Sequence, residues 1–149
     1  MKREFRTASA DETIALGREL ASELARARIV LLRGDLGAGK TTFTKGVAEG
    51  LDAASQDEVT SPTFTLIHEY RGPDNTVFHI DLYRIENDRE LATLGLDDLM
   101  NEEGNLLLIE WGEKFPRLLR DHDAEIIFTR LSDNERQIVL STRPTGSEE

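Results

Sequence analysis

The stretch "RGDLGAGKTTF", Arg33–Phe43, is the part of this sequence that most strongly indicates its fold. Four of its residues, Gly34, Gly39, Lys40 and Thr41, satisfy the nucleotide-binding pattern G-x-x-x-x-G-K-[ST]. An apolar, β-forming run precedes the stretch and a helix-forming segment follows it, which is the context that a phosphate-binding loop requires. The alternative interpretation, a glycine-rich turn without a ligand, is disfavoured by this context. We therefore predict a nucleotide site between a buried strand and a helix.

Each position of this loop has a physical task. Glycines adopt the backbone angles that turn successive N–H groups toward one anion. The helix that begins near Lys40 adds its N-terminal dipole and its free N–H groups. The Lys40 ammonium is expected to reach the outer phosphates, and the Thr41 hydroxyl to ligate Mg²⁺. The loop alone selects neither the base of the nucleotide nor the reaction.

Length and composition limit the class of protein. The 149 residues correspond to about one domain, so we expect residues 1–143 to form a single P-loop domain and residues 144–149 to be a frayed tail. The absence of cysteine excludes disulfides and thiolate metal sites. A formal charge of −11 argues against a free-standing nucleic-acid-binding protein, because such binding depends on Lys and Arg. No apolar run approaches the about 20 residues of a membrane span, and no secretory block opens the chain, so we expect a cytoplasmic protein.

Periodicity and turn residues predict an α/β fold, a three-layer P-loop NTPase-like domain with a mixed, partly antiparallel sheet of about seven strands. Ser9 and Glu12 form a capping box that opens a helix through about Arg26. Turn residues between two pairs of strands predict two hairpins. The expected strands lie at 3–8, 28–34, 63–70, 76–83, 105–111, 124–131 and 136–142, and the expected helices at 10–26, 40–50, within 87–104, and at 113–121.

A P-loop needs an acidic side chain from elsewhere in the chain to help hold its metal, and Glu110 is the first of two candidates. It follows the apolar run Leu106–Ile109 and precedes Trp111, which is the Walker B pattern with Glu in place of the more common Asp. Glu110 could ligate Mg²⁺ directly or act as a base that positions a water. The structural alternative is a surface acid that merely ends a strand.

Asp81, in "FHIDLYR", is the second candidate. Side chains alternate between the faces of a strand, so His79, Asp81 and Tyr83 share one face while Phe78, Ile80 and Leu82 share the other. A polar face behind an apolar one is typical of a site wall, where Asp81 could hold the water shell of the metal or orient the attacking water. His79 is equally well explained as a packed, hydrogen-bonded histidine.

The segment "TSPTF", Thr60–Phe64, offers two interpretations. Hydroxyl residues beside a proline can form a loop whose threonine senses a γ-phosphate, as in nucleotide switches. A turn that leads into a strand explains the same residues equally well.

Four motifs in this order and spacing, "GDLGAGKTTF", "SPTF", "HIDLYR" and "LIEWGEKF", resemble the TsaE family of bacterial ATPases of tRNA threonylcarbamoyladenosine biosynthesis. The resemblance runs from about residue 5 to residue 140. The P-loop is generic, whereas "HIDLYR" together with "LIEW" is specific. The resemblance implies a P-loop fold with a mixed sheet, binding of ATP with Mg²⁺, and slow ATP hydrolysis by the isolated protein.

The resemblance also implies partners. TsaE proteins are understood to dock on the TsaB–TsaD heterodimer, which transfers threonylcarbamoyl to the adenosine next to the anticodon of tRNA. Their ATP hydrolysis resets that complex between rounds. The chain would then meet tRNA only indirectly, through the complex, and no membrane is involved.

Carried onto this sequence, the resemblance implies roles for individual residues. Thr41 and Glu110 would ligate Mg²⁺, and Asp81 would assist hydrolysis, which makes Lys40, Asp81 and Glu110 the candidate catalytic residues. Whether Asp81 or Glu110 positions the water stays open. The phosphates would be cradled by Leu36, Gly37, Ala38, Gly39, Lys40, Thr41 and Thr42.

Two further positions follow from the same resemblance. Trp111 would lie beside the site. The adenine contacts follow no motif, and the region near Thr7 to Asp11 is a candidate for them.

Three other functions use the same loop. A small-molecule kinase needs an Arg-bearing lid over the phosphates, but the only lid-like segment, Asp88–Gly104, carries the single arginine Arg89 among several acids. A GTPase would carry the guanine-reading N-K-x-D signature, which the sequence lacks. A protein that uses ATP only to hold an assembly together, with turnover secondary, is also compatible with the motifs.

Overall fold

Seven strands form one mixed sheet in the order β1-β7-β6-β2-β5-β4-β3. The computed structural model describes residues 1–35, 37–62 and 65–143. Within these ranges the strands are β1 (Lys2–Thr7), β2 (Ile29–Arg33), β3 (Ile67–Arg71), β4 (Thr76–Asp81), β5 (Asn105–Glu110), β6 (Ala124–Arg130) and β7 (Arg136–Thr142). The helices are α1 (Ala10–Ala27), α2 (Lys40–Gly50), α3 (Asp88–Ala92), α4 (Leu96–Asn101) and α5 (Pro116–Asp121), with short 3₁₀ turns η1 (Gln56–Glu58) and η2 (Gly112–Lys114).

The four central strands, β6, β2, β5 and β4, run parallel to one another. Strand β3 pairs antiparallel with β4, β7 with β6, and β1 with β7. The predicted mixed α/β sheet with two hairpins is therefore confirmed. The expected frayed tail, residues 144–149, lies outside the described residues.

Two strands of the first hairpin are shorter than the sequence predicted. Strand β3 begins at Ile67, because Leu66 has a left-handed φ of 70° that interrupts the extended backbone. Residues 63 and 64 of the predicted strand lie outside the described residues. Strand β4 ends at Asp81 and not at residue 83, because the Tyr83 N–H turns back to donate to Asp81 Oδ1. Both differences come from backbone turns that hydrophobic alternation does not report.

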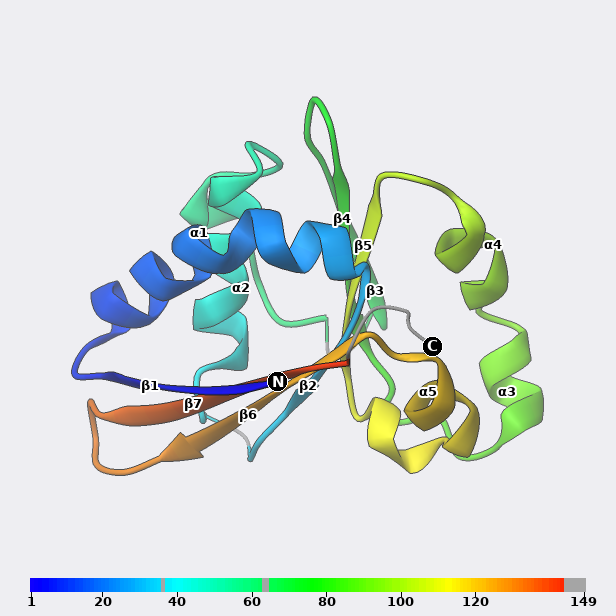
Figure 1. The fold of residues 1–149 in the computed structure, drawn as a ribbon. Coiled ribbons are helices and arrows are strands. Elements are labelled where there is room, and N and C mark those ends of the chain that lie inside the picture. The colour runs from blue at the N-terminus through cyan, green and yellow to red at the C-terminus, as the bar shows by residue number, and fades with distance from the viewer. Residues whose placement is uncertain (36, 63–64, 144–149) are drawn as a thin grey trace.

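Helices cover the sheet on both faces, with α1 and α2 on one side and α3, α4 and α5 on the other (Figure 1). The central strands alternate between the two cores: Val30 and Leu108 face α1 and α2, whereas Leu31 and Ile109 face the other helices. Parallel strands that are covered on both faces are nearly continuously apolar, as Leu106–Ile109 within β5 are. No helix within the described ranges is both long and apolar enough to cross a membrane.

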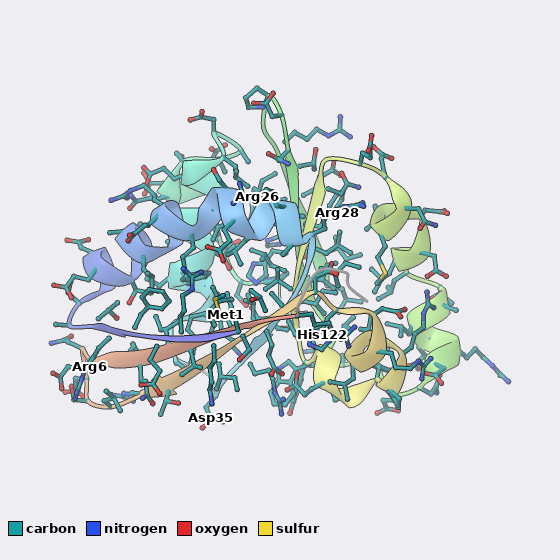
Figure 2. The ribbon with its side chains drawn as sticks, viewed as in Figure 1. Met1, Arg6, Arg26, Arg28, Asp35 and His122 are labelled. Atoms are coloured by element: carbon teal, nitrogen blue, oxygen red, sulfur yellow. The ribbon has the colours of Figure 1, made fainter. Side chains whose placement is uncertain are left out.

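Ser9 caps the start of α1 as predicted, but the second hydrogen bond differs from that of a capping box, because Glu12 accepts the N–H of Ala8 and not that of the N-cap Ser9. Ser9 Oγ accepts the Glu12 N–H at 3.1 Å, and the Glu12 carboxylate accepts the Ala8 N–H at 2.7 Å. The helix ends where Arg28 adopts a φ of 79°. Figure 2 shows Arg28 at this turn into β2, where its Nη2 donates to the Met100 carbonyl at 2.7 Å. Local signals thus start the helix, and a contact distant in sequence fixes its end.

Glycines allow α1 and α2 to touch backbone to backbone. A Cβ added to Gly46 would lie 1.9 Å from the Ile14 carbonyl oxygen, and one added to Gly17 would lie 2.4 Å from the Phe43 carbonyl oxygen. Both distances are far inside van der Waals contact, so neither helix has room for a larger residue at these positions. This contact fixes α2, and with it the start of the helix at Lys40, against α1.

The substitution Gly46→Ala is predicted to destabilise the protein by about 1–3 kcal/mol, because the new methyl group would force the two helices apart. Helix propensity alone predicts the opposite sign, a gain of about 1 kcal/mol. Urea unfolding measures the difference. Glu19→Ala, on the exposed side of α1, is the control and should stay within about 0.5 kcal/mol of the parent. A Gly46→Ala variant as stable as the parent would contradict the close contact.

Candidate active site

The candidate site lies where β2, β4 and β5 end, along the lower edge of the sheet in Figure 1. The three strands are parallel, so their carboxyl ends meet at this edge, where ligands of open α/β sheets bind. The strand register sets Asp81 beside Glu110 and Glu110 beside Leu32. Asp35, which follows β2, projects from the same edge in Figure 2. The P-loop thus begins next to two acids that come from other strands.

The P-loop carries glycines in the left-handed backbone region that L side chains rarely adopt, with φ of 80° at Gly37 and 110° at Gly39. Gly39 is also the N-cap of α2 and supplies no side-chain cap, so the positive end of the helix is left for an anion. Ala38 is buried, and its N–H donates to the Asp35 carbonyl at 3.0 Å. Leu36, the first of the predicted phosphate-binding residues, lies outside the described residues.

Lys40, at the start of α2, is buried with 8% of its surface exposed. Its Nζ donates to the Gly34 carbonyl at 2.6 Å and lies 3.4 Å from Glu110 Oε1. The ammonium also lies 5.5 Å from the centre of the Trp111 ring, within the range of a cation–π interaction. A buried ammonium needs such partners, and here they aim it at the ends of β2 and β5.

The two predicted acids are both buried, each with 5% of its surface exposed. Glu110 Oε2 is hydrogen-bonded to His79 Nε2 at 2.6 Å, and Glu110 Oε1 faces Lys40. Asp81 Oδ1 accepts the Tyr83 N–H at 2.9 Å. A P-loop lysine, a Walker B-type glutamate and a second carboxylate therefore converge from three elements.

Alternation along β4 explains why these side chains share a side. Phe78 and Ile80 pack in the core under α3, α4 and α5, so the residues between and after them, His79 and Asp81, face α2. The predicted division of the strand into two faces is confirmed. Tyr83 lies beyond the end of the strand, is mostly exposed, and packs its ring 5.3 Å from that of Trp111.

The environments of the two carboxyls shift their pKa values in opposite directions. Burial raises the pKa of Asp81, the hydrogen bond from the Tyr83 N–H offsets part of this rise, and the Glu110 carboxylate adds to it. Burial by itself would also raise the pKa of Glu110, but the hydrogen bond from His79 and the charge of Lys40 outweigh it and lower that pKa. Glu110 is thus held as a carboxylate, while Asp81 takes up a proton more readily than an ordinary aspartate. Such separation of two pKa values is typical of functional sites.

A cavity of about 660 Å³ opens in front of these groups, and small-molecule sites measure roughly 300–1,000 Å³. The P-loop and α2 form one wall, with Gly37, Gly39, Lys40, Thr41 and Thr42. The strand ends form a second wall, with Asp81, Tyr83, Glu110 and Trp111. The remaining lining comes from Ser9, Ala10, Thr13, Ser61, Asp133, Asn134 and Arg136.

The sequence did not single out the turn between β6 and β7 as part of this cavity. Arg136, just after that turn, donates from Nη2 to the Gly37 carbonyl at 3.1 Å and from Nη1 to the Ser132 carbonyl at 2.9 Å. The guanidinium therefore ties the P-loop to the hairpin. Nothing in "SDNER" distinguishes this turn from an ordinary one, because its contact partner lies 99 positions away in the chain.

The segment Thr60–Phe64 reaches the cavity through Ser61. Its first residue is held from β3: the Thr60 carbonyl lies 3.2 Å from His68 Nδ1, and the Thr60 N–H donates to the Tyr70 hydroxyl at 3.4 Å. Thr63 and Phe64 lie outside the described residues, so the choice between a phosphate-sensing loop and a strand-entry turn stays open.

One known protein family matches most of this sequence. The sequence profile described as "Threonylcarbamoyl adenosine biosynthesis protein TsaE" matches residues 7–138, which span the P-loop, both acids and the β6–β7 turn. The chain belongs to the TsaE family.

Individual TsaE proteins align over most of their length. The tRNA threonylcarbamoyladenosine biosynthesis protein TsaE of Bacillus subtilis (strain 168) is 39% identical over 137 residues, which cover 92% of this chain and 84% of the relative. The protein of the same name from Haemophilus influenzae is 43% identical over 115 residues, covering 77% and 70%. A crystal structure of Bacillus subtilis YdiB superposes with a TM-score of 0.71 at 34% identity, over 95% of this chain and 86% of that one.

The residues of this TsaE-family chain fit a nucleotide with its metal. The uncapped start of α2 and the buried Lys40 ammonium suit a chain of phosphates. Within the described ranges, no cluster of three or more His, Asp or Glu side chains could hold a metal by itself. Mg²⁺ is usually bound by one or two carboxylates together with substrate phosphates and waters. The Thr41 hydroxyl and the Glu110 carboxylate therefore suit Mg²⁺ better than a metal whose ligands all come from the protein.

Asp81→Asn is predicted to raise the thermal midpoint of the free TsaE-family chain by up to a few °C. A change of about 1 kcal/mol in the free energy of unfolding shifts the midpoint by this amount in a domain of this size. The buried charge beside Glu110 disappears, and the amide oxygen can still accept the Tyr83 N–H. Because the pKa of Asp81 is raised in the folded protein, folding of the parent becomes less favourable as the pH rises above 3.8, the ordinary pKa of this carboxyl. The gain should therefore be largest at neutral pH and shrink toward pH 3.8. Thermal unfolding of both proteins across this pH range checks it, and a loss of stability at pH 7 would contradict it.

Proposed function

We propose that this chain is a Mg²⁺-dependent ATPase of tRNA threonylcarbamoyladenosine biosynthesis, with residues 1–143 acting as one ATPase domain. The convergence of Lys40, Asp81 and Glu110 on one cavity at the P-loop carries the proposal. Membership in the TsaE family supports the pathway, since the relatives are named for it. ATP hydrolysis, the metal and the cytoplasmic location are inferred from the site and from the bacterial relatives.

The triphosphate is proposed to lie along the P-loop wall, where Gly37, Gly39, Thr41 and Thr42 border the cavity together with Lys40. The nucleoside would then extend toward the remaining lining. That region includes Ser9 and Ala10, which lie within the stretch Thr7–Asp11 that was the candidate for the adenine contacts. Thr13 and the β6–β7 turn complete this end of the cavity.

The proposed reaction is in-line attack of water on the γ-phosphate. The Lys40 ammonium would stabilise negative charge on the transferring group and on the leaving oxygen. Glu110 and Thr41 would hold Mg²⁺, which when bound neutralises phosphate charge. Asp81 would orient the attacking water, because its carboxyl lies next to Glu110 and borders the same cavity. Burial makes these interactions stronger than they would be in water.

The output of hydrolysis is proposed to be a change in a partner. The resemblance to the TsaE family implies that hydrolysis resets the TsaB–TsaD heterodimer, and we propose the same role for this chain. The acidic chain, with a formal charge of −11, would leave tRNA contact to the complex.

The kinase alternative finds little support in the fold. The lid-like segment Asp88–Gly104 forms α3 and α4, whose Leu91 and Leu96 pack into the core on the sheet face opposite to α2. None of the described residues that line the cavity comes from this segment. A lid that closes over phosphates would need to lie on the other side of the sheet.

Purified chain is predicted to hydrolyse ATP slowly alone and at least several-fold faster with purified TsaB–TsaD heterodimer. The rate of ADP formation is measured for the chain, the heterodimer and the mixture, with tRNA as a further addition. EDTA is the control and should abolish the activity. A rate that is indifferent to the heterodimer, despite tight ATP binding, would reject the partner, and ADP formed in step with a phosphorylated metabolite would indicate a kinase.

Lys40→Ala is predicted to weaken nucleotide binding and turnover together, whereas Asp81→Asn should spare binding and lower turnover by about 10²-fold, the scale of a lost catalytic group. The ammonium meets the phosphates in both ground and transition states, and the carboxylate acts only on the attacking water. Trp111, the only tryptophan, lies beside Lys40, so its fluorescence is expected to change when ADP binds. Arg26→Ala removes a positive charge from the far end of α1 (Figure 2) and is the control. Equal loss of binding in both site variants would reject this division of roles.

A further inference from the structure

His79 is a buried polar residue that the proposed reaction does not use. Its side chain is completely buried, and it is absent from the described lining of the cavity. It therefore contacts neither nucleotide nor solvent. Among the described residues, its side chain makes one hydrogen bond, from Nε2 to Glu110 Oε2 at 2.6 Å, which joins it to the acid proposed to hold the metal.

The partners of the imidazole assign its proton. Nδ1 is buried and has no hydrogen-bond partner among the described residues, so an N–H at that atom would be left unsatisfied in the interior. An N–H at Nε2 meets a carboxylate oxygen, and hydrogen bonds to charged groups are among the strong ones. The geometry therefore favours an N–H on Nε2, which donates to Glu110 Oε2.

This hydrogen bond decides which oxygen of Glu110 faces the cavity. Oε2 is held from behind by His79, so Oε1 is the oxygen that points toward Lys40 at 3.4 Å. Without the histidine, the carboxylate would be free to bring both oxygens to the Lys40 ammonium. A close ion pair of that kind would occupy the two groups that the phosphates and the metal need.

We propose that His79 is a positioning residue, which fixes Glu110 through Oε2 so that Oε1 stays available for the metal and Lys40 for the phosphates. The inference rests on the proposed function of Glu110 as a metal ligand. Partners of metal-binding carboxylates outside the ligand shell typically change metal affinity or activity by about 10- to 100-fold when they are removed. A histidine that merely filled space in the core would have no such effect.

Two substitutions of similar polarity separate the roles. The amide Nε2 of His79→Gln lies as many bonds from Cα as the Nε2 of histidine, so it can still donate to Glu110. The amide nitrogen of His79→Asn lies at the position of Nδ1 and cannot reach Glu110. Both variants bury an amide, so a difference between them reports the hydrogen bond. His79→Leu, which removes all polarity, is a third variant.

The first measurement needs no hydrolysis. Mn²⁺, a paramagnetic substitute for Mg²⁺, is titrated into the ADP-bound protein, and its binding is followed by electron paramagnetic resonance. We expect about 10-fold weaker Mn²⁺ binding in His79→Asn and His79→Leu, and binding within about 3-fold of the parent in His79→Gln. ADP affinity without metal, read from Trp111 fluorescence, should stay unchanged in all three. If His79→Asn and His79→Gln both keep the parental thermal midpoint and bind Mn²⁺ with equal affinity, the proposal is overturned.

Hydrolysis with the TsaB–TsaD heterodimer is the second measurement. We expect kcat to fall about 10- to 100-fold in His79→Asn with KM for ATP within about 3-fold of the parent, and to recover in His79→Gln. A folded His79→Asn variant as active as the parent would overturn the role of the histidine. If the parent itself hydrolyses no ATP, the proposed function fails, while the Mn²⁺ titration still decides whether His79 positions Glu110.

Discussion

The burial of one ammonium between a carbonyl and a carboxylate is the constraint on which the rest of this structure depends. Lys40 Nζ is held by the Gly34 carbonyl and faces Glu110, and charges this deep are tolerated only when they are paired. The pairing requires β2 and β5 to lie side by side in one register. It also requires α2 to begin at the edge where both strands end. The parallel centre of the sheet, covered by helices on both faces, meets these requirements together.

The supports of this arrangement lie outside the cavity. Gly17 and Gly46 let α1 and α2 meet backbone to backbone, so the helix that carries Lys40 cannot shift alone. Arg136 joins the P-loop to the β6–β7 hairpin. His79 holds Glu110 from the interior. Each support fixes one member of the site from a different segment of the chain, which is how a site of a few side chains is kept in one geometry.

The two carboxyl groups of the site, Glu110 and Asp81, have pKa values that their surroundings shift in opposite directions. Glu110 is surrounded by donors and positive charge, which keep it ionised despite its burial. Burial and the neighbouring Glu110 carboxylate make the charge of Asp81 less favourable, and the hydrogen bond from the Tyr83 N–H offsets only part of this effect. Under the proposed function this difference separates a metal ligand from a group that handles water. The raised pKa of Asp81 predicts that its charge lowers the stability of the free protein, and a local loss of stability is common where activity is located.

The sequence by itself determined the elements and the identity of the central chemistry. Glycine spacing with Lys40 and Thr41 predicted the P-loop, and the apolar run before Glu110 predicted a buried strand ending in an acid. Alternation in β4 placed His79 and Asp81 on one face. All of these are local patterns, which can be recognised along the sequence. Tertiary structure alone decided that β3 begins at Ile67, that Arg136 reaches Gly37, and that His79 donates to Glu110. These depend on backbone turns and on side chains that meet only when distant segments pack. A sequence gives no distance between such segments, and that distance is what turns candidate residues into a site.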